Sequence, residues 1–113
     1  MIKSRICDIL DIKYPVFQGG MAWVADANLA AAVSEAGGLG IIAAMNMSGE
    51  LLREEIKKLR AVTDKPFGVN VMLMSPFAAE VAEVVVEERV PVVTTGAGKP
   101  VTYMKKWLDA GVK

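Results

Sequence analysis

Residues 64–77 read DKPFGVNVMLMSPF, and this stretch decides the fold. Asp64-Lys65-Pro66 is turn chemistry, the run Phe67–Leu73 is almost wholly apolar, and Ser75-Pro76 is typical of a helix start. An apolar run between a turn and a helix indicates a strand buried on both faces, as in a parallel sheet. Its one polar residue, Asn70, must find hydrogen-bond partners or cost roughly 1 to 3 kcal/mol, which makes it a candidate ligand residue.

The same alternation continues on both sides of this stretch. Apolar runs predict further strands at 14–18, 39–43 and 91–95. Apolar residues at helical spacing predict helices over 26–36, 49–62, 75–89 and 101–110, with Asp26 as an N-cap and Gly37-Gly38 as a left-handed stop. Four strands that alternate with four helices predict parallel βαβ units.

Four such units fit half of a barrel or a short doubly wound sheet, and periodicity alone does not choose between them. In both folds the ligand lies at the carboxyl ends of the strands. The unusual residues of this chain gather there: Gly19-Gly20-Met21-Ala22-Trp23, Ala44-Met45-Asn46, Asn70 and Thr94-Thr95-Gly96-Ala97-Gly98. A Rossmann fingerprint would open a helix, whereas Gly37-Gly38-Leu39-Gly40 closes one, so dinucleotide binding of that type is disfavoured.

Composition excludes several classes of protein. The 113 residues allow one domain, and thirteen basic residues balance thirteen acidic ones, which points to neither nucleic acid nor a membrane surface. With no apolar run near the roughly 20 residues of a membrane span, we expect a cytoplasmic protein. The single Cys7 is expected to be a packing residue, and the absence of histidine leaves any acid–base chemistry to other groups. Glu54-Glu55 and Glu87-Glu88 are expected on solvated helix faces rather than at a metal.

Most candidate residues allow two interpretations. Gly19-Gly20 either turns the chain or lets its backbone approach a flat ligand, and Met21 either fills a core or packs against an aromatic ring. Thr94-Thr95-Gly96 either ends a ladder or borders a ligand. Trp23 is a lid or a packing residue, and Lys99 is expected to be solvated.

Four stretches, at 14–26, 29–42, 64–77 and 92–98, together resemble the FMN-dependent enoyl-acyl-carrier-protein reductase II group within the wider nitronate monooxygenase family. The resemblance covers nearly the whole chain. Gly19-Gly20-Met21-Ala22-Trp23 favours the reductase branch, since nitronate oxidisers usually place Ala-Pro before the Met. The resemblance implies a (β/α)8 TIM barrel, with residues 1–113 as about the first four βα units of one FMN-binding domain.

By the same resemblance, FMN is reduced by NADH or NADPH and passes hydride to a trans-2-enoyl thioester on acyl carrier protein, in fatty-acid biosynthesis. Gly19, Gly20, Met21 and Ala22 would line the isoalloxazine, Asn70 would hydrogen-bond it, and Thr95 with Gly96 would border the substrate side. No catalytic residue and no metal ligand is assigned. Two alternatives stay open: a nitronate monooxygenase, and an inactive half-barrel assembly module.

The chain departs from the family pattern in being much shorter than a complete barrel. A complete barrel takes about 250 residues, and the family's histidine and phosphate-gripping glycine loops have no counterpart in these 113. We therefore expect the chain alone to be inactive and to hold FMN weakly or not at all. Unpaired edges on the first and fourth strands invite association, so we expect a homodimer or a complex with a second half-barrel.

Overall fold

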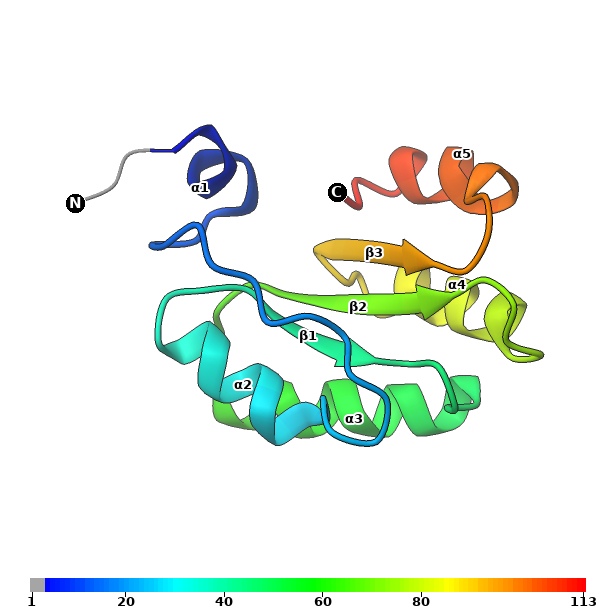
Figure 1. Cartoon of the computed structure of the whole chain (residues 1–113), viewed down its shortest axis with the longest axis horizontal. Helices are drawn as coiled ribbons and strands as arrows, with labels where there is room; N and C mark the ends of the chain where they lie inside the picture. Colours follow the sequence, from blue (N-terminus) through cyan, green and yellow to red (C-terminus); the bar gives the residue numbers. More distant parts are fainter. Residues whose placement is uncertain (1–3) are drawn as a thin grey trace.

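The computed structural model describes residues 4–113, and Figure 1 shows three parallel strands with helices packed around them. The sheet has the order β1-β2-β3. The strands are β1 (Gly40–Ala43), β2 (Phe67–Met72) and β3 (Val92–Gly96), and the helices are α1 (Arg5–Leu10), α2 (Ala27–Glu35), α3 (Gly49–Val62), α4 (Ala78–Glu87) and α5 (Val101–Asp109). The predicted α/β class with a parallel sheet is confirmed.

The register of the sheet defines two faces. Side chains alternate along a strand, so residues paired across the three strands share a face. Ile42, Val69 and Val93 lie on the face covered by α2 to α5, called here the outer face. Ala43, Asn70 and Thr94 form one layer of the opposite face, the inner face.

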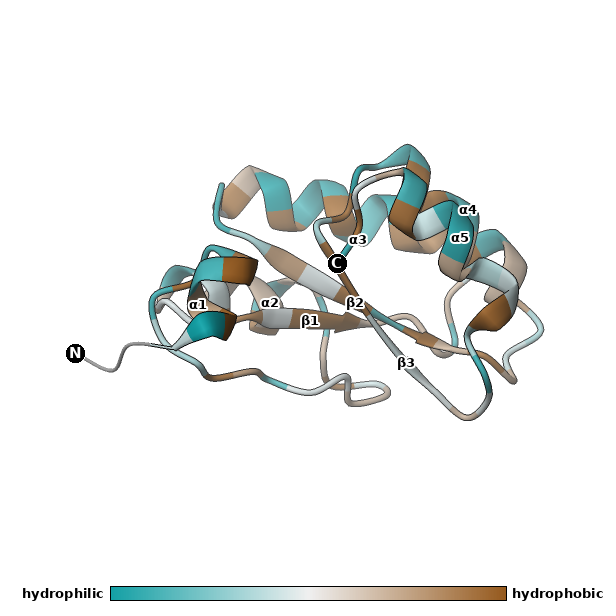
Figure 2. Cartoon of the chain, turned by 90° about the horizontal axis from the view of Figure 1, so that it is seen from above, coloured by the Kyte–Doolittle hydropathy of each residue, from teal (hydrophilic) through white to brown (hydrophobic). Residues whose placement is uncertain are grey.

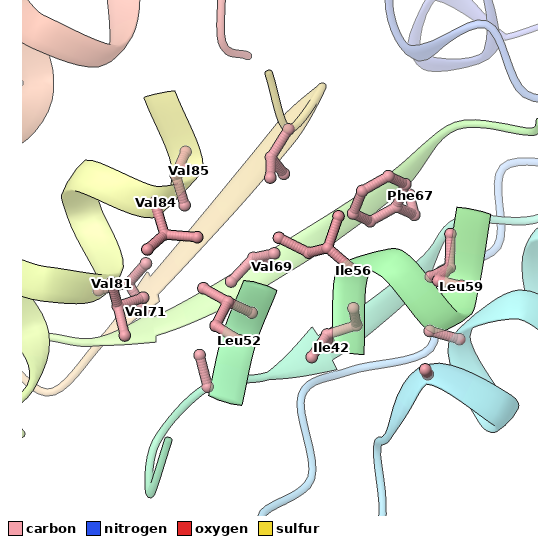
Figure 3. Packing of buried hydrophobic residues seen from close by; sticks show 14 of the residues in the cluster. Ile42, Leu52, Ile56, Leu59, Phe67, Val69, Val71, Val81, Val84 and Val85 are labelled. Carbon is pink, nitrogen blue, oxygen red and sulfur yellow. The ribbon is translucent and has the colours of Figure 1, made fainter. Parts of the chain in front are cut away.

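The main core lies between the outer face and the helices, as Figure 3 shows. Helix α3 buries Leu52, Ile56 and Leu59 completely, at the spacing of one helical stripe. Helix α4 adds Val81 and Val85. Each such side chain contributes about 1.5 to 3 kcal/mol to the stability of the fold when buried. Figure 2 shows the complementary hydrophilic stripes on α3 and α4.

A smaller cluster covers the inner face near the start of the strands. Leu10 and Ile12 pack there against Leu39, Ile41 and Val92, and Cys7 packs against this cluster as expected. Helix α1 carries part of the cluster and was not predicted. The helix has only six residues, which is a short stretch for a sequence pattern. The hydroxyl of Ser4 caps it by accepting from the Ile6 backbone N–H at 3.3 Å.

The prediction of a continuous strand at 14–18 is wrong. This segment runs beside β1 but makes a single parallel bridge, Phe17 with Leu39. Pro15 bends the chain, and the Val16 N–H turns back to the Tyr14 carbonyl at 2.8 Å instead of pairing with β1. This edge of the sheet is nevertheless partly covered, because the Val16 carbonyl accepts from the N–H of Leu39, just before β1, and the Ala25 carbonyl accepts from the N–H of Ala43.

The open edge expected on the fourth predicted strand, β3, is also partly covered. Lys113 donates its N–H to the Pro91 carbonyl at 3.0 Å, and its carbonyl accepts from the Val93 N–H at 2.7 Å. These two bonds are those of a parallel ladder. The expectation that both outer edges are unpaired is therefore corrected within residues 4–113.

Helix boundaries differ from expectation at one place. Helix α4 begins at Ala78 without a side-chain cap, instead of at Ser75-Pro76. The Ser75 hydroxyl accepts from the Phe77 N–H at 3.1 Å and closes a turn that precedes the helix. At the end of α2, Gly37 has φ +105°, and the Gly38 N–H bonds the Val33 carbonyl, so the predicted left-handed stop is confirmed.

Two helix starts are capped by carboxylates from the next helix along the chain. Glu55 of α3 accepts from the Ala27 N–H at 3.2 Å, and Glu80 of α4 accepts from the Gly49 N–H at 3.0 Å. Because the Glu55 side chain is only 14% exposed, its expected place on a solvated face is wrong. Glu87 and Glu88 are half-exposed but ion-pair with Arg53, which joins α4 to α3.

Candidate functional site

The candidate site lies where the strands end, on the inner face. Ala43, Asn70 and Thr94 are opposite one another in the register, one on each strand. The next layer pairs Met72 with Gly96. Because the three strands are parallel, their carboxyl ends meet at one edge of the sheet, which is where barrel and doubly wound folds bind ligands.

Asn70 is the centre of this layer. The Thr94 hydroxyl donates to Oδ1 of Asn70 at 2.8 Å, which leaves the amide NH2 group available as a donor. A Cβ atom built on Gly20 would lie 2.6 Å from Cβ and 3.2 Å from Nδ2 of Asn70. The backbone at Gly20 therefore rests directly on the Asn70 side chain, and this close approach is the reason for glycine at the position.

Gln18 holds the glycine loop in place. Its side-chain amide donates to the Ile41 carbonyl at 3.0 Å and accepts from the Ile41 N–H at 3.2 Å. The side chain thus takes the place of one pair of backbone hydrogen bonds in the strand that the sequence predicted. Freed from the ladder, the chain at Gly19 and Gly20 can cross toward Asn70. Sequence reasoning missed this role, since a Gln at a strand end has no periodic signal.

The structure leaves room for a flat ligand beside the loop. A Cβ atom on Gly19 or Gly96 would meet no atom within 4 Å. Gly96 pairs with Met72 at the strand ends, and Gly19 directly precedes the residue that rests on Asn70, so both glycines lie near this end of the sheet. Backbone without side chains and a free amide donor fit the edge of a flavin ring, which is planar and accepts hydrogen bonds.

Met21 and Ala22 begin a tight turn away from the glycines. The Met21 carbonyl accepts from the N–H groups of Val24 and Ala25, and Trp23 has φ +67° with its side chain 89% exposed. Ala22 and Trp23 border a hollow of about 290 Å³ that is lined mainly by apolar atoms of this turn and of Met45. Trp23 is not a packing residue within the described chain.

Thr95 and Thr94 point in opposite directions. Thr95 pairs with Val71, whose side chain is in the outer core, and Thr95 lines a small hollow with Met104 and Trp107 of α5. The predicted site residue therefore faces away from Asn70, and Thr94 is the residue brought to it. The alternation from Asn70 could have found Thr94 only if the pairing of β2 with β3 had been known.

The charged groups with displaced pKa values lie on the outer helices. A hydrogen bond to Glu87, then to Glu88, raises the pKa of the exposed Arg53. A hydrogen bond to Glu55 raises the pKa of Lys58. Lys99, in the loop after β3, is exposed as expected. The inner-face layer itself offers neutral hydrogen-bonding groups.

Comparison with known proteins agrees with the fold. A family model described as nitronate monooxygenase matches residues 3–112. The structure of FabK from Thermotoga maritima superposes with a TM-score of 0.98 and 50% identity, covering 100% of this chain and 36% of that one. A nitroalkane oxidase from Streptomyces ansochromogenes superposes with a TM-score of 0.86 and 29% identity, covering 96% and 41%.

Curated relatives carry two further names. A (3aS,4S,5R,7aS)-5-hydroxy-7a-methyl-1-oxo-octahydro-1H-indene-4-carboxyl-CoA dehydrogenase from Mycobacterium tuberculosis is 36% identical over 110 residues, which are 97% of this chain and 31% of that protein. A probable nitronate monooxygenase from Staphylococcus saprophyticus is 42% identical over 74 residues, which are 66% of this chain and 21% of that protein.

Fold, site position and relatives together define part of a TIM-barrel domain of the kind found in FabK and nitroalkane oxidase. The chain belongs to the nitronate monooxygenase family. The match to FabK confirms its resemblance to the enoyl-acyl-carrier-protein reductase II group within that family. The chain spans only 31% of the length of the Mycobacterium protein. Among residues 4–113, no helix is long and apolar enough to cross a membrane.

Proposed function

We propose that residues 1–113 form the first part of one FMN-binding barrel domain, in an enzyme that reduces trans-2-enoyl thioesters of acyl carrier protein with NADH or NADPH. The observation that carries the proposal is the meeting of Gly20 and Asn70 on the inner face. There a glycine backbone, an oriented amide and open space share the ligand end of the sheet.

All but one of the predicted site residues have a part in this proposal. Gly19 and Gly20 let the backbone approach the isoalloxazine, Met21 and Ala22 line it where the following turn begins, and Gly96 leaves space at the end of β3. Asn70 donates from Nδ2 to an edge of the ring. Thr95 has no part in this proposal, because its side chain lies on the outer face.

Bound FMN supplies the hydride chemistry, and the protein supplies orientation and polarity. A donor aimed at the ring's edge stabilises the electron-rich reduced form more than the oxidised form. The amide of Asn70 can do this without a proton transfer, since it is neutral across the physiological range. A site of neutral donors is therefore suited to a reaction whose charge changes occur on the cofactor.

The reductase reaction is favoured over nitronate oxidation by the Gly19-Gly20-Met21-Ala22-Trp23 run and by the 50% identity to FabK, against 29% to the nitroalkane oxidase. The relatives nevertheless have four different names, and nitronate oxidation is the second candidate. The two reactions differ in what re-oxidises the flavin: an enoyl thioester in the first and molecular oxygen in the second.

The test grafts residues 1–113 in place of the matching first part of Thermotoga maritima FabK. We expect a yellow protein with about one FMN per chain, and NAD(P)H oxidation that depends on a short trans-2-enoyl thioester. Oxygen uptake with an alkyl nitronate, in place of thioester-dependent oxidation, would favour the second candidate.

Two variants of the graft form a matched pair. Asn70→Leu keeps the number and branching of the side-chain heavy atoms but removes the amide, and we expect weaker FMN binding and slower reduction. Thr95→Val alters the neighbouring outer-face residue, and we expect little change in either. A folded, colourless graft would exclude the flavin proposal and would support the third possibility, an assembly module without cofactor.

A further inference from the structure

We infer that Thr94 is a positioning residue that sets the plane of the Asn70 amide, so that the NH2 group of Asn70 faces the ligand side of the inner face. The inference rests on the proposed flavin site and deepens it. Neither residue is ionisable, so the arrangement acts through geometry alone.

The two ends of the amide have different surroundings. Oδ1 lies 2.8 Å from the Thr94 hydroxyl on the neighbouring strand. Nδ2 lies on the side of the Gly20 backbone, 3.2 Å from the position that a Cβ there would occupy. The amide is therefore held between β3 on one side and the glycine loop on the other, with its donor end toward Gly20.

Without the Thr94 hydroxyl this orientation would be poorly determined. The terminal torsion of asparagine is broad and roughly two-fold, so an unrestrained amide rotates among several orientations. Only some of those orientations point the NH2 group at a ligand. A fixed amide therefore binds a ring acceptor without the entropy cost of being ordered at the moment of binding.

The chain contains its own control. Thr95 has the same side chain, is the next residue along β3, and lines a hollow against α5 on the outer face. Replacing either threonine by valine exchanges a hydroxyl for a methyl group of similar volume. A general loss of strand stability should follow from both changes, whereas loss of amide orientation should follow only from Thr94→Val. Thr94→Ser keeps the hydroxyl and should restore the orientation.

The first measurement needs no flavin. In the ¹⁵N-labelled 113-residue chain, the side-chain NH2 signals of Asn70 are assigned by their absence in Asn70→Leu. We expect Thr94→Val to move these signals toward those of free asparagine, and Thr94→Ser and Thr95→Val to leave them close to the wild type. Unchanged Asn70 signals in Thr94→Val, or an equal change in Thr95→Val, would overturn the inference.

The second measurement is an FMN titration of the wild type, Thr94→Val, Thr94→Ser and Thr95→Val. Binding is monitored through the backbone signals, so that weak binding is measurable. One net hydrogen bond corresponds to about a fivefold change in affinity, and we expect that loss for Thr94→Val and less than a twofold change for the other two variants. Equal affinity of Thr94→Val and the wild type would refute the role in binding. If the wild-type chain does not respond to FMN, the same titration is made on the FabK graft, and a graft that does not bind FMN would refute the proposed flavin site. The Asn70 signals then decide separately whether Thr94 orients the amide.

Discussion

Replacing Gly20 by alanine should separate the loop from Asn70. The added methyl would lie 2.6 Å from Cβ of Asn70, about 0.8 Å short of an ordinary contact near 3.4 Å. The Cβ of Asn70 is fixed to strand β2 and cannot rotate away, so the loop or the strand must move. If Asn70 takes up a shift of that size away from Thr94, the 2.8 Å bond between them stretches beyond 3.5 Å, where it no longer counts as a hydrogen bond.

We expect this overpacking to cost about 1 to 3 kcal/mol, out of a total stability of about 5 to 15 kcal/mol. The chain should therefore still fold, with a urea midpoint lower by about 1 M and with displaced Asn70 side-chain signals. Gly19→Ala is the matched control, because a methyl there meets nothing within 4 Å. Its cost should stay within about 0.5 kcal/mol. Equal midpoints for the two variants, or an undisturbed Asn70 in Gly20→Ala, would refute the close packing described here.

Further predictions concern the helices, the cofactor and association. In Gly40→Ala a methyl would lie 1.8 Å from the Ala30 carbonyl oxygen, so we expect loss of most of the near-ultraviolet circular dichroism signal. Glu55→Ala should lower the free energy of unfolding by about 1 kcal/mol, because the cap at Ala27 is lost, whereas Glu55→Gln should lose less. The pKa of Lys58 is raised in the folded chain, so the stabilising contribution of Lys58 is present below its unfolded pKa and is lost only as the pH rises through its folded pKa, in the alkaline range. Urea titrations between pH 6 and 8 should therefore show that Lys58→Met does not change how the free energy of unfolding depends on pH. The chain alone should lose FMN on gel filtration, and retained stoichiometric FMN would contradict this expectation. In sedimentation it should self-associate through exposed apolar side chains such as Phe17 and Trp23, and a stable monomer would contradict that expectation.

Local patterns in the sequence predicted most of the outer half of this fold. The apolar runs at 39–43, 67–73 and 91–95 became strands, and the stripes after them became α3, α4 and α5 close to their expected bounds. These signals are local: each depends on residues within one element, and the burial of that element follows its own periodicity. Asn70 was identified for the same reason, as a polar residue inside an apolar run.

Other features depended on contacts between distant segments. The run at 14–18 has the composition of a strand, but Gln18 pairs with Ile41 through its side chain and ends the ladder early. The carboxylate of Glu55 caps a helix that begins 28 residues earlier in the chain. No pattern within either segment contains these partners.

The sequence by itself determined that the chain alternates buried strands with amphipathic helices, and that its unusual glycines and its buried amide fall at strand ends. Only the tertiary structure decided which of two adjacent threonines reaches that amide. The choice depends on the register between β2 and β3, because a one-residue shift of pairing turns every side chain of a strand to the other face. That register places Thr94 on Asn70 and Thr95 against α5.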